Sequence, residues 1–217
     1  MIVEHLVVGA LGCNCTILGD ERSGEAAIVD GGDDVDAIVE RLTAHGLRAK
    51  YLLHTHAHFD HIAAVGALRE RTGGAAMLHP ADVPLYHALA EQPRWVGLAA
   101  QMPPVVRLDG DLRDGDTIAL GEARIAVHHT PGHTPGSTSF AFSIDNESTL
   151  LTGDTLFRGS IGRWDLGGTS QEDIVRSIRA KLLVYADSTT VIPGHGAPTT
   201  VGIERRTNPY LQEYTGR

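Results

Sequence analysis

The sequence carries a dense cluster of metal-binding side chains in the pattern His-x-His-x-Asp-His, formed by His56, His58, Asp60 and His61. The apolar residues 51–53 before it predict a strand, and the apolar spacing after it predicts a helix that begins at Asp60. Side chains two apart in an extended segment point the same way, so His56 and His58 could bind one divalent ion together. Asp60 and His61, in the first helical turn, would face a second position beside the first. Imidazole and carboxylate ligands suit Zn, Fe or Mn.

Three further polar residues each sit in a loop of small residues that follows an expected strand. They are His133 in Thr-Pro-Gly-His-Thr-Pro-Gly, Asp154 in Thr-Gly-Asp-Thr, and His195 in Pro-Gly-His-Gly. Flanking glycine and proline give a rigid loop of little bulk, which lets an ion and its substrate approach the backbone. Each one alone could be a turn residue. Together with the first cluster they predict a shared metal centre.

The elements that must position these residues are short strands with interspersed helices. Two early strands are expected to pair, and Asp145-Asn146 predicts a hairpin turn between two later ones. Residues 91–104 contain three prolines and are expected to form a loop. Expected strands cover 2–8, 14–18, 26–29, 51–53, 75–78, 105–108, 117–120, 124–128, 138–144, 150–152 and 190–192, and expected helices cover 34–44, 60–71, 80–90 and 170–183. This order favours an α/β fold, a four-layer sandwich with helices on both outer faces.

Composition bounds the class of protein. The chain has 217 residues, 42% of them hydrophobic, and a formal net charge of −9. This length and apolar content predict one domain over 1–217 and argue against disorder. The acidic balance argues against nucleic acid as a partner, and no apolar run is long enough to span a membrane. The start lacks a basic segment typical of a secretion signal, so we expect a cytoplasmic protein. The oligomeric state stays open.

Taken together, these motifs resemble the metallo-β-lactamase superfamily, whose hallmark is the same His-x-His-x-Asp-His pattern followed by a spaced His, Asp and His. Within it the chain is similar to short bacterial hydrolases related to glyoxalase II, and the resemblance runs from Asn14-Cys15 to Asn208-Pro209. The resemblance implies an αββα sandwich with the metals at one edge, between the two sheets. The C-terminal helical domain of glyoxalase II is expected to be missing.

The resemblance also implies a role for each candidate ligand. Two divalent ions per chain are expected, most simply Zn, with Fe or Mn as alternatives. The first ion would bind His56, His58 and His133, the second would bind Asp60, His61 and His195, and Asp154 would bridge the two. Zinc β-lactamases usually lack an aspartate at the position of Asp154, so the resemblance disfavours a β-lactamase.

The implied activity is hydrolysis of a small-molecule thioester by a hydroxide that the two ions share. Asp60 and Asp154 would be the catalytic carboxylates, with Asp60 also handling the transferred proton. Arg163 lies near the position where glyoxalase II binds its thiol carrier with a basic residue, and it would contact the substrate here. Glyoxalase II has tyrosine two positions later, whereas this chain has Asp165, so an ion pair between Arg163 and Asp165 is the alternative.

Two other functions stay open. A persulfide dioxygenase of the same superfamily would bind one iron through His56, His133 and Asp154, although that branch typically lacks the intact Pro-Gly-His-Gly segment present at 193–196. A non-catalytic metal-binding module is the other. The sequence leaves open the thiol carrier, the acyl group and the roles of a few residues near the motifs. These residues are His54, His129, Cys13 and Cys15.

Overall fold

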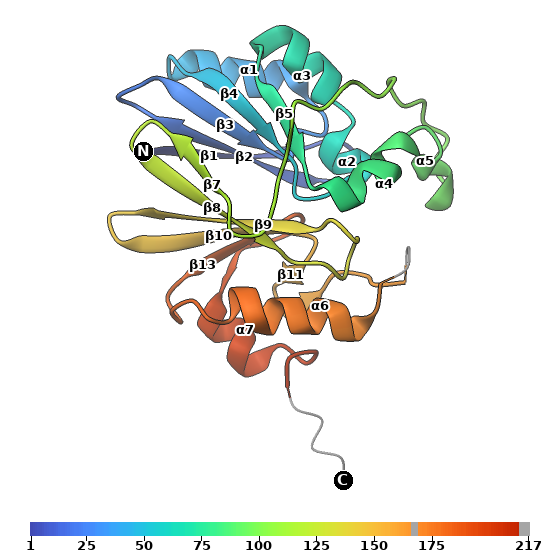
Figure 1. Ribbon diagram of the computed structural model, residues 1–217, viewed down its shortest axis with the longest axis vertical. Helices are drawn as coiled ribbons and strands as arrows, with labels where there is room; N and C mark the ends of the chain where they lie inside the picture. The colour runs from blue at the N-terminus through green and yellow to red at the C-terminus, as the bar shows by residue number, and fades with distance from the viewer. Residues whose placement is uncertain (166–168, 213–217) are drawn as a thin grey trace.

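The computed structural model describes residues 1–165 and 169–212, and it stacks two β-sheets between two layers of helices (Figure 1). The first sheet has six strands in the order β1-β2-β3-β4-β5-β6. Its strands are β1 (Ile2–Val8), β2 (Cys13–Asp20), β3 (Glu25–Val29), β4 (Arg48–Leu53), β5 (Ala75–Leu78) and β6 (Gly110–Asp111). The first three are antiparallel, and β3 to β6 are parallel.

The second sheet also has six strands, in the order β14-β13-β10-β9-β8-β7. They are β7 (Thr117–Leu120), β8 (Ala123–His129), β9 (Thr138–Ile144), β10 (Glu147–Gly153), β13 (Thr190–Pro193) and β14 (Thr199–Thr200). A small hairpin of β11 (Leu156–Phe157) and β12 (Ser160–Ile161) lies beside it. Asp145 and Asn146 both have positive φ in the β9–β10 turn, which confirms the expected hairpin.

Helices cover the outer face of each sheet (Figure 1). Those beside the first sheet are α1 (Val35–Ala44), α2 (Phe59–Ile62), α3 (Val65–Thr72), η1 (Pro80–Asp82), α4 (Val83–His87) and α5 (Gln92–Trp95). Those beside the second are α6 (Gln171–Ser177), η2 (Ile178–Leu182) and α7 (Val201–Thr207). The expected four-layer αββα sandwich is therefore confirmed. In the part of the chain that is described, none of the helices combines the length and apolar character needed to cross a membrane.

Three hydrophobic layers fill the gaps between the four structural layers. Because side chains alternate along a strand, Leu52 of β4 packs among the helices while Leu53 packs against the second sheet. Phe140 of β9 joins Leu53 in the central layer. Ile174 and Ile178 form the third layer between the second sheet and its helices. Burial of these apolar faces holds the two sheets face to face and fixes which strand ends meet at the site.

Three expectations differ from the structure. The loop expected over 91–104 contains the short helix α5, because proline is tolerated in the first turn of a helix, where its missing N–H would have no helical partner. The helix expected over 60–71 is broken into α2 and α3, because the amide of Ala64 donates to the carbonyl of Gly32 rather than to the helical carbonyl of residue 60. The strand expected over 105–108 is not formed. There the amide of Val106 donates to the hydroxyl of Tyr86, and pairing with β5 begins only at Gly110.

Candidate metal centre

All seven candidate ligands lie together at one edge of the sandwich, where strands of both sheets end. His56 follows β4 of the first sheet, while His133, Asp154 and His195 follow β8, β10 and β13 of the second. Strands β10 and β13 are parallel. Strand β8 runs the same way as β10, because both β8 and β10 pair with β9 in the antiparallel sense. Their carboxyl ends therefore meet at the same edge, which brings residues far apart in sequence into one pocket.

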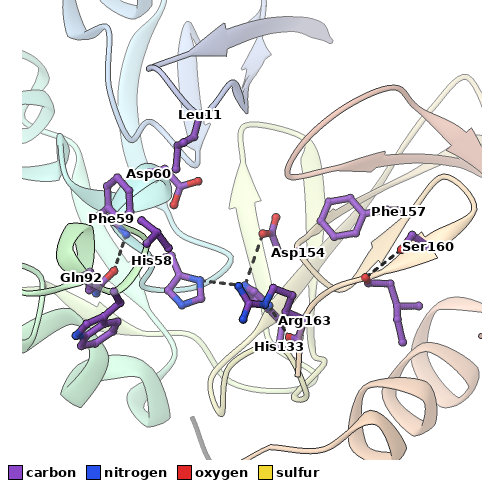
Figure 2. A pocket seen from close by; sticks show the side chains of 13 residues that line it. Leu11, His58, Phe59, Asp60, Gln92, His133, Asp154, Phe157, Ser160 and Arg163 are labelled. Atoms are coloured by element: carbon purple, nitrogen blue, oxygen red, sulfur yellow. Dashed lines mark hydrogen bonds and ion pairs between the residues drawn. The ribbon is translucent and has the colours of Figure 1, made fainter. Parts of the chain in front are cut away.

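The first group of ligand atoms comes from His56, His58 and His133, all within 4.8 Å of one another. His58 Nδ1 lies 2.9 Å from His133 Nε2, a separation that requires a shared proton or a shared cation. Figure 2 shows the two rings pointing at each other from opposite sides of the pocket. The structure thus brings together the three residues that the sequence analysis assigned to the first ion.

The second group consists of Asp60, His61 and His195. Asp60 Oδ2 lies 3.0 Å from His195 Nε2 and 3.6 Å from His61 Nε2. The two imidazole Nε2 atoms are 3.2 Å apart. These are the three residues that the sequence analysis assigned to the second ion.

Asp154 lies between the two groups and directs one oxygen to each. Its Oδ2 is 3.6 Å from Nε2 of His133 in the first group. Its Oδ1 is 3.5 Å from Nε2 of His61 and 3.8 Å from Nε2 of His195 in the second. A carboxylate in this position could bind two cations at once, as expected.

The site fits a pair of metal ions by two independent observations. Metal–ligand bonds of about 2.1 Å in tetrahedral geometry place ligand atoms about 3.4 Å apart, close to the separations found here. In addition, His56 Nε2 and Asp154 Oδ1 are buried without a hydrogen-bond partner among the described residues. Buried polar atoms left unpaired cost free energy, so these two atoms are arranged for a partner that is neither backbone nor side chain.

The ring nitrogens that face away from the site are held by hydrogen bonds. A ring whose Nδ1 donates a proton presents an unprotonated Nε2, the form that binds a metal. Four histidines follow this rule. Nδ1 of His56 donates to Thr55 Oγ1 and Nδ1 of His61 donates to Asp30 Oδ2, each at 3.0 Å. Nδ1 of His133 donates to the Arg163 carbonyl at 2.8 Å, and Nδ1 of His195 donates to the Gly12 carbonyl at 3.1 Å.

Asp30 anchors the metal-binding loop from the end of β3. Its carboxylate accepts the backbone amide and the hydroxyl of Thr55, each at 2.7 Å, as well as Nδ1 of His61. The Sγ of Cys13 lies 3.4 Å from the same ring nitrogen of His61, and Cys13 and Cys15 are both buried free thiols. Thus Cys13 contacts the candidate ligand His61 at the ring nitrogen that faces away from the site.

Asp82 joins the two loops that carry the first group. Its carboxylate accepts the backbone amide of Ala57 at 3.0 Å and that of Gly136 at 2.6 Å, and the hydroxyl of Thr134 at 2.8 Å. Ala57 precedes His58, and Thr134 follows His133. One buried side chain therefore fixes the distance between loops of different sheets.

Gln92 braces the same loop from the other side. Its amide oxygen accepts the backbone amide of Phe59 at 2.8 Å, and its amide nitrogen donates to the carbonyls of Ala57 and Leu85, each at 2.9 Å. Gln92 begins α5, so the short helix that lines the pocket is tied to the metal loop.

The loop that carries His195 is tied to the first sheet by Asn14. The backbone amide of Asn14 donates to the carbonyl of Gly194 at 2.7 Å. Its side-chain amide donates to the carbonyls of Pro193 and Gly196 at 2.9 and 3.0 Å. The ligands of the second group are thereby joined across the two sheets.

Electrostatics keep part of the site in its ligating form. Burial and the charge of His61 lower the pKa of His56 well below its ordinary value. Burial and the charge of His133 lower the pKa of His58 to about 3. Burial alone would favour a neutral Asp60, but the hydrogen bond from His195 and the charge of His61 lower the pKa of this carboxyl. At neutral pH these three groups are neutral imidazoles and a carboxylate.

The imidazoles of the second group hold protons more tightly. Burial opposes the charge on His61, but Cys13, Asp154 and Asp30 together raise the pKa of this ring. Burial likewise opposes the charge on His195, but the hydrogen bond to Asp60 and the charge of Asp154 raise its pKa. A cation at this group must displace these protons, so its binding will be pH-dependent.

A pocket of about 400 Å³ opens over the candidate ligands. Figure 2 shows His58, Asp60, His133 and Asp154 among the side chains that line it. Its walls are mostly apolar and include Leu11, Phe59, Trp95, Val96, Phe157 and Ile161. Such a cavity with a few convergent polar groups is typical of an enzyme site for a small molecule.

Arg163 lines this pocket and also pairs with Asp165. Its position is therefore compatible with both sequence-based interpretations, contact with the substrate and an ion pair with Asp165. Its Nε and an Nη lie 3.0 and 3.1 Å from the Asp165 carboxylate oxygens. Both side chains are more than half exposed, so this ion pair stabilises the fold little.

Sequence reasoning missed four residues that hold the site, namely Asp30, Asp82, Gln92 and Asn14. Asp30 directly follows the strand expected over 26–29, and an aspartate between a buried strand and two glycines resembles the other ligand loops. Asp82 and Gln92 gave no such signal. Of the residues left open, His54 donates Nδ1 to the carbonyl of His61, and His129 donates Nε2 to the carbonyl of Pro135.

Comparisons of sequence and of structure find related proteins. A family model described as Metallo-beta-lactamase superfamily matches residues 8–195. Hydroxyacylglutathione hydrolase GloC of Haemophilus influenzae is 35% identical over 219 residues, which cover 97% of this chain and 98% of that protein. The crystal structure of BLEG-1 B3 metallo-beta-lactamase superimposes with a TM-score of 0.87 at 34% identity, covering 98% of this chain and all of the other (100%). That of TTHA1623 in a di-iron-bound form gives 0.83 at 35% identity, covering 96% and 100%.

Proposed function

Because the chain belongs to the metallo-beta-lactamase superfamily, we propose that it is a binuclear metal-dependent hydrolase that cleaves S-acyl conjugates of small thiols. The observation that carries the proposal is Asp154, whose two oxygens each face one of two groups of three ligands. The similarity to a hydroxyacylglutathione hydrolase over nearly the whole chain supports a thioester substrate.

The reaction adds water to the thioester carbonyl and breaks the C–S bond, which yields a carboxylic acid and a free thiol. A pair of divalent cations supplies Lewis acidity, which lowers the pKa of water to near neutrality and offsets negative charge on the carbonyl oxygen. His56, His58 and His133 would hold one cation, and Asp60, His61 and His195 the other. Asp154 would fix their separation.

Asp60 is the chain's own group for moving a proton. It is held as a carboxylate and lines the pocket beside the ligands. It would take a proton from water during attack and return it to the departing thiolate. The apolar walls around it limit the access of bulk water.

Zinc is the simplest occupant, because three His or His/Asp ligands plus a bridging carboxylate suit its coordination. Iron and manganese accept the same donors, and the related TTHA1623 was crystallised with two irons. Arg163 would contact an anionic group of the thiol carrier and would give up part of its ion pair with Asp165 to do so. We place the protein in the cytoplasm, with small-molecule thioesters as its partners.

The test combines metal analysis with thiol release. Protein loaded in turn with Zn, Fe and Mn is expected to hold about two ions per chain and to hydrolyse S-lactoylglutathione or another thioester. His58→Ala should lose one ion and the activity, whereas the exposed control Asp36→Asn should keep both. Activity that survives complete chelation would refute the proposal. So would inactivity towards esters, thioesters and lactones with two ions bound.

Two other substrates belong in the same assay. The similarity to BLEG-1 favours including a chromogenic β-lactam, and turnover of this compound in preference to every thioester would identify a β-lactamase. One iron per chain with oxygen consumption on glutathione persulfide would instead indicate the dioxygenase. The presence of seven converging ligands, more than one iron needs, supports the binuclear hydrolase.

A further inference from the structure

A second pocket, of about 280 Å³, adjoins the first on the side of α4. Its apolar lining includes Ala81, Leu85, Ala88 and Pro135. Three residues line both pockets, namely Trp95, His58 and His133. The two cavities therefore meet at the His58–His133 pair, with Trp95 as their common wall.

This arrangement matches the shape of a thioester. Two arms diverge from the carbonyl carbon, the acyl chain and the thiol carrier, and hydrolysis requires the carbonyl itself to lie over the metal ligands. A substrate centred at the His58–His133 pair could send one arm into each pocket. The chemistry of the two linings decides which arm enters which pocket.

Although its walls are mostly apolar, the first pocket also has Ser160 and the charged Arg163, which are not candidate metal ligands and suit a polar thiol carrier. Apart from its two histidines, the second has one polar residue among its described lining, Thr134. The hydroxyl of Thr134 is already bonded to Asp82 at 2.8 Å and to Ser137 at 2.8 Å. A polar or charged group that enters this pocket would lose water without gaining a partner.

We propose that the second pocket is an acyl subsite that selects unsubstituted aliphatic acyl chains, with Trp95 separating the acyl chain from the thiol carrier. This inference rests on the proposed thioesterase function and names its substrate class. It predicts that straight acyl chains are better substrates than acyl groups that carry a terminal carboxylate.

The subsite is built on a braced wall, which favours selective binding. The carbonyl of Leu85 accepts the side chain of Gln92, and the same side chain binds the carbonyl of Ala57 beside the metal loop. The neighbouring Tyr86 is buried and its hydroxyl accepts the amide of Val106. The position of α4 is thus fixed relative to His58, so an acyl chain would enter a preformed cavity.

The experiment varies the acyl group while the thiol stays constant. Metal-loaded protein is assayed with N-acetylcysteamine thioesters of acetyl, butyryl, hexanoyl and succinyl groups. Each methylene that enters the pocket should raise kcat/KM by about fourfold. Succinyl should fall well below butyryl, which has the same four carbons. Ala88→Phe should flatten the dependence on chain length, whereas Ala90→Phe, at an exposed residue that lines neither pocket, should preserve it.

A binding measurement gives a readout independent of turnover. The chain has two tryptophans, so Trp164→Phe leaves Trp95 as the only indole. Addition of hexanamide, an uncharged acyl probe, to this metal-free protein should shift the Trp95 fluorescence with saturation. The shift should weaken at least tenfold in affinity when Ala88→Phe is added.

The outcomes separate the subsite from the function. Hydrolysis of all four thioesters at similar kcat/KM, or an Ala88→Phe effect that follows the thiol rather than the acyl group, would overturn the acyl subsite and leave the thioesterase intact. Failure to hydrolyse any thioester with two metals bound would overturn the proposed function, and the subsite with it.

Discussion

Replacement of Asp82 by asparagine tests whether hydrogen bonds from outside the metal ligands set the geometry of the site. Asp82 is buried, contacts no expected metal position, and accepts three hydrogen bonds from the loops of His58 and His133. Asparagine has the same shape but only one acceptor oxygen. Its amide group would face the backbone amide of Ala57 or of Gly136, donor against donor.

The cost can be worked from these contacts. One buried N–H left without an acceptor costs about 1–3 kcal/mol, and the hydroxyl of Thr134 can turn to Ser137. Burial raises the pKa of Asp82, because the charged carboxylate is destabilised away from water. A neutral asparagine avoids this penalty, which offsets part of the cost of the unpaired N–H. We expect a net loss of about 2 kcal/mol, or a fall in Tm of about 4–8 °C for a chain of this size.

The effect on the metal should exceed that of an ordinary surface change. Supporting hydrogen bonds around a metal site typically contribute 10- to 100-fold to affinity, about 1.4–2.7 kcal/mol. Competition with a chromophoric chelator measures the affinity, and thermal unfolding of the metal-free protein measures stability. The control is Asp36→Asn, an exposed residue paired with Arg71, which should change neither by more than about 0.5 kcal/mol. Wild-type affinity in the Asp82→Asn protein would refute the reasoning.

Three more perturbations address the ligands and their surroundings. Asp154→Asn should reduce the bound metal below two ions per chain and lower activity by more than about 100-fold, because an amide cannot bridge two cations, and metal analysis checks this. Gly194→Ala would place a Cβ on Asp154 Oδ1 and 2.8 Å from His61 Cε1, so metal content should fall while circular dichroism stays unchanged; two tightly bound ions would contradict this. Burial lowers the pKa of His54 from an ordinary value of 6.5 to about 4. Between pH 4 and pH 6.5 the folded state therefore binds fewer protons than the unfolded state. Metal-free protein should therefore lose about 3 kcal/mol of stability as pH falls through this range, and His54→Gln should remove that part of the loss in denaturant titrations at each pH.

The sequence was informative about the ligands because their signal is local. Histidines and aspartates sit at fixed spacing around His58, or singly between glycine and proline after a strand, as at His133. Residue type and position alone therefore identify them. Their convergence has a further cause in the structure. The loops of His133, Asp154 and His195 follow strands of the second sheet that run the same way, and the face-to-face packing of the sheets brings the loop of His56 to them. The layer order was accessible for a similar reason, because alternating apolar residues and helical spacing report which faces are buried.

The supporting residues could not be found in this way. Asp82 and Gln92 bind backbone amides and carbonyls. Because nearly every residue has these groups, the type of the residue that is bound gives no sign of the contact. The break between α2 and α3 has the same origin, a bond from Ala64 to a carbonyl of a different loop. Local propensity favours one helix there, and a tertiary hydrogen bond overrides it.

These supporting contacts also decide how the metal relates to folding. Asp30 fixes the loop after β4, Asp82 ties that loop to the loop after β8, and Asn14 ties the loop after β13 to β2. None of these bonds involves a metal, and each joins segments already held by the three hydrophobic layers. The ligand loops are therefore positioned by the protein, and cations add stability in proportion to their binding rather than creating the fold. The site differs in this respect from small zinc domains, whose chains are unfolded without the ion.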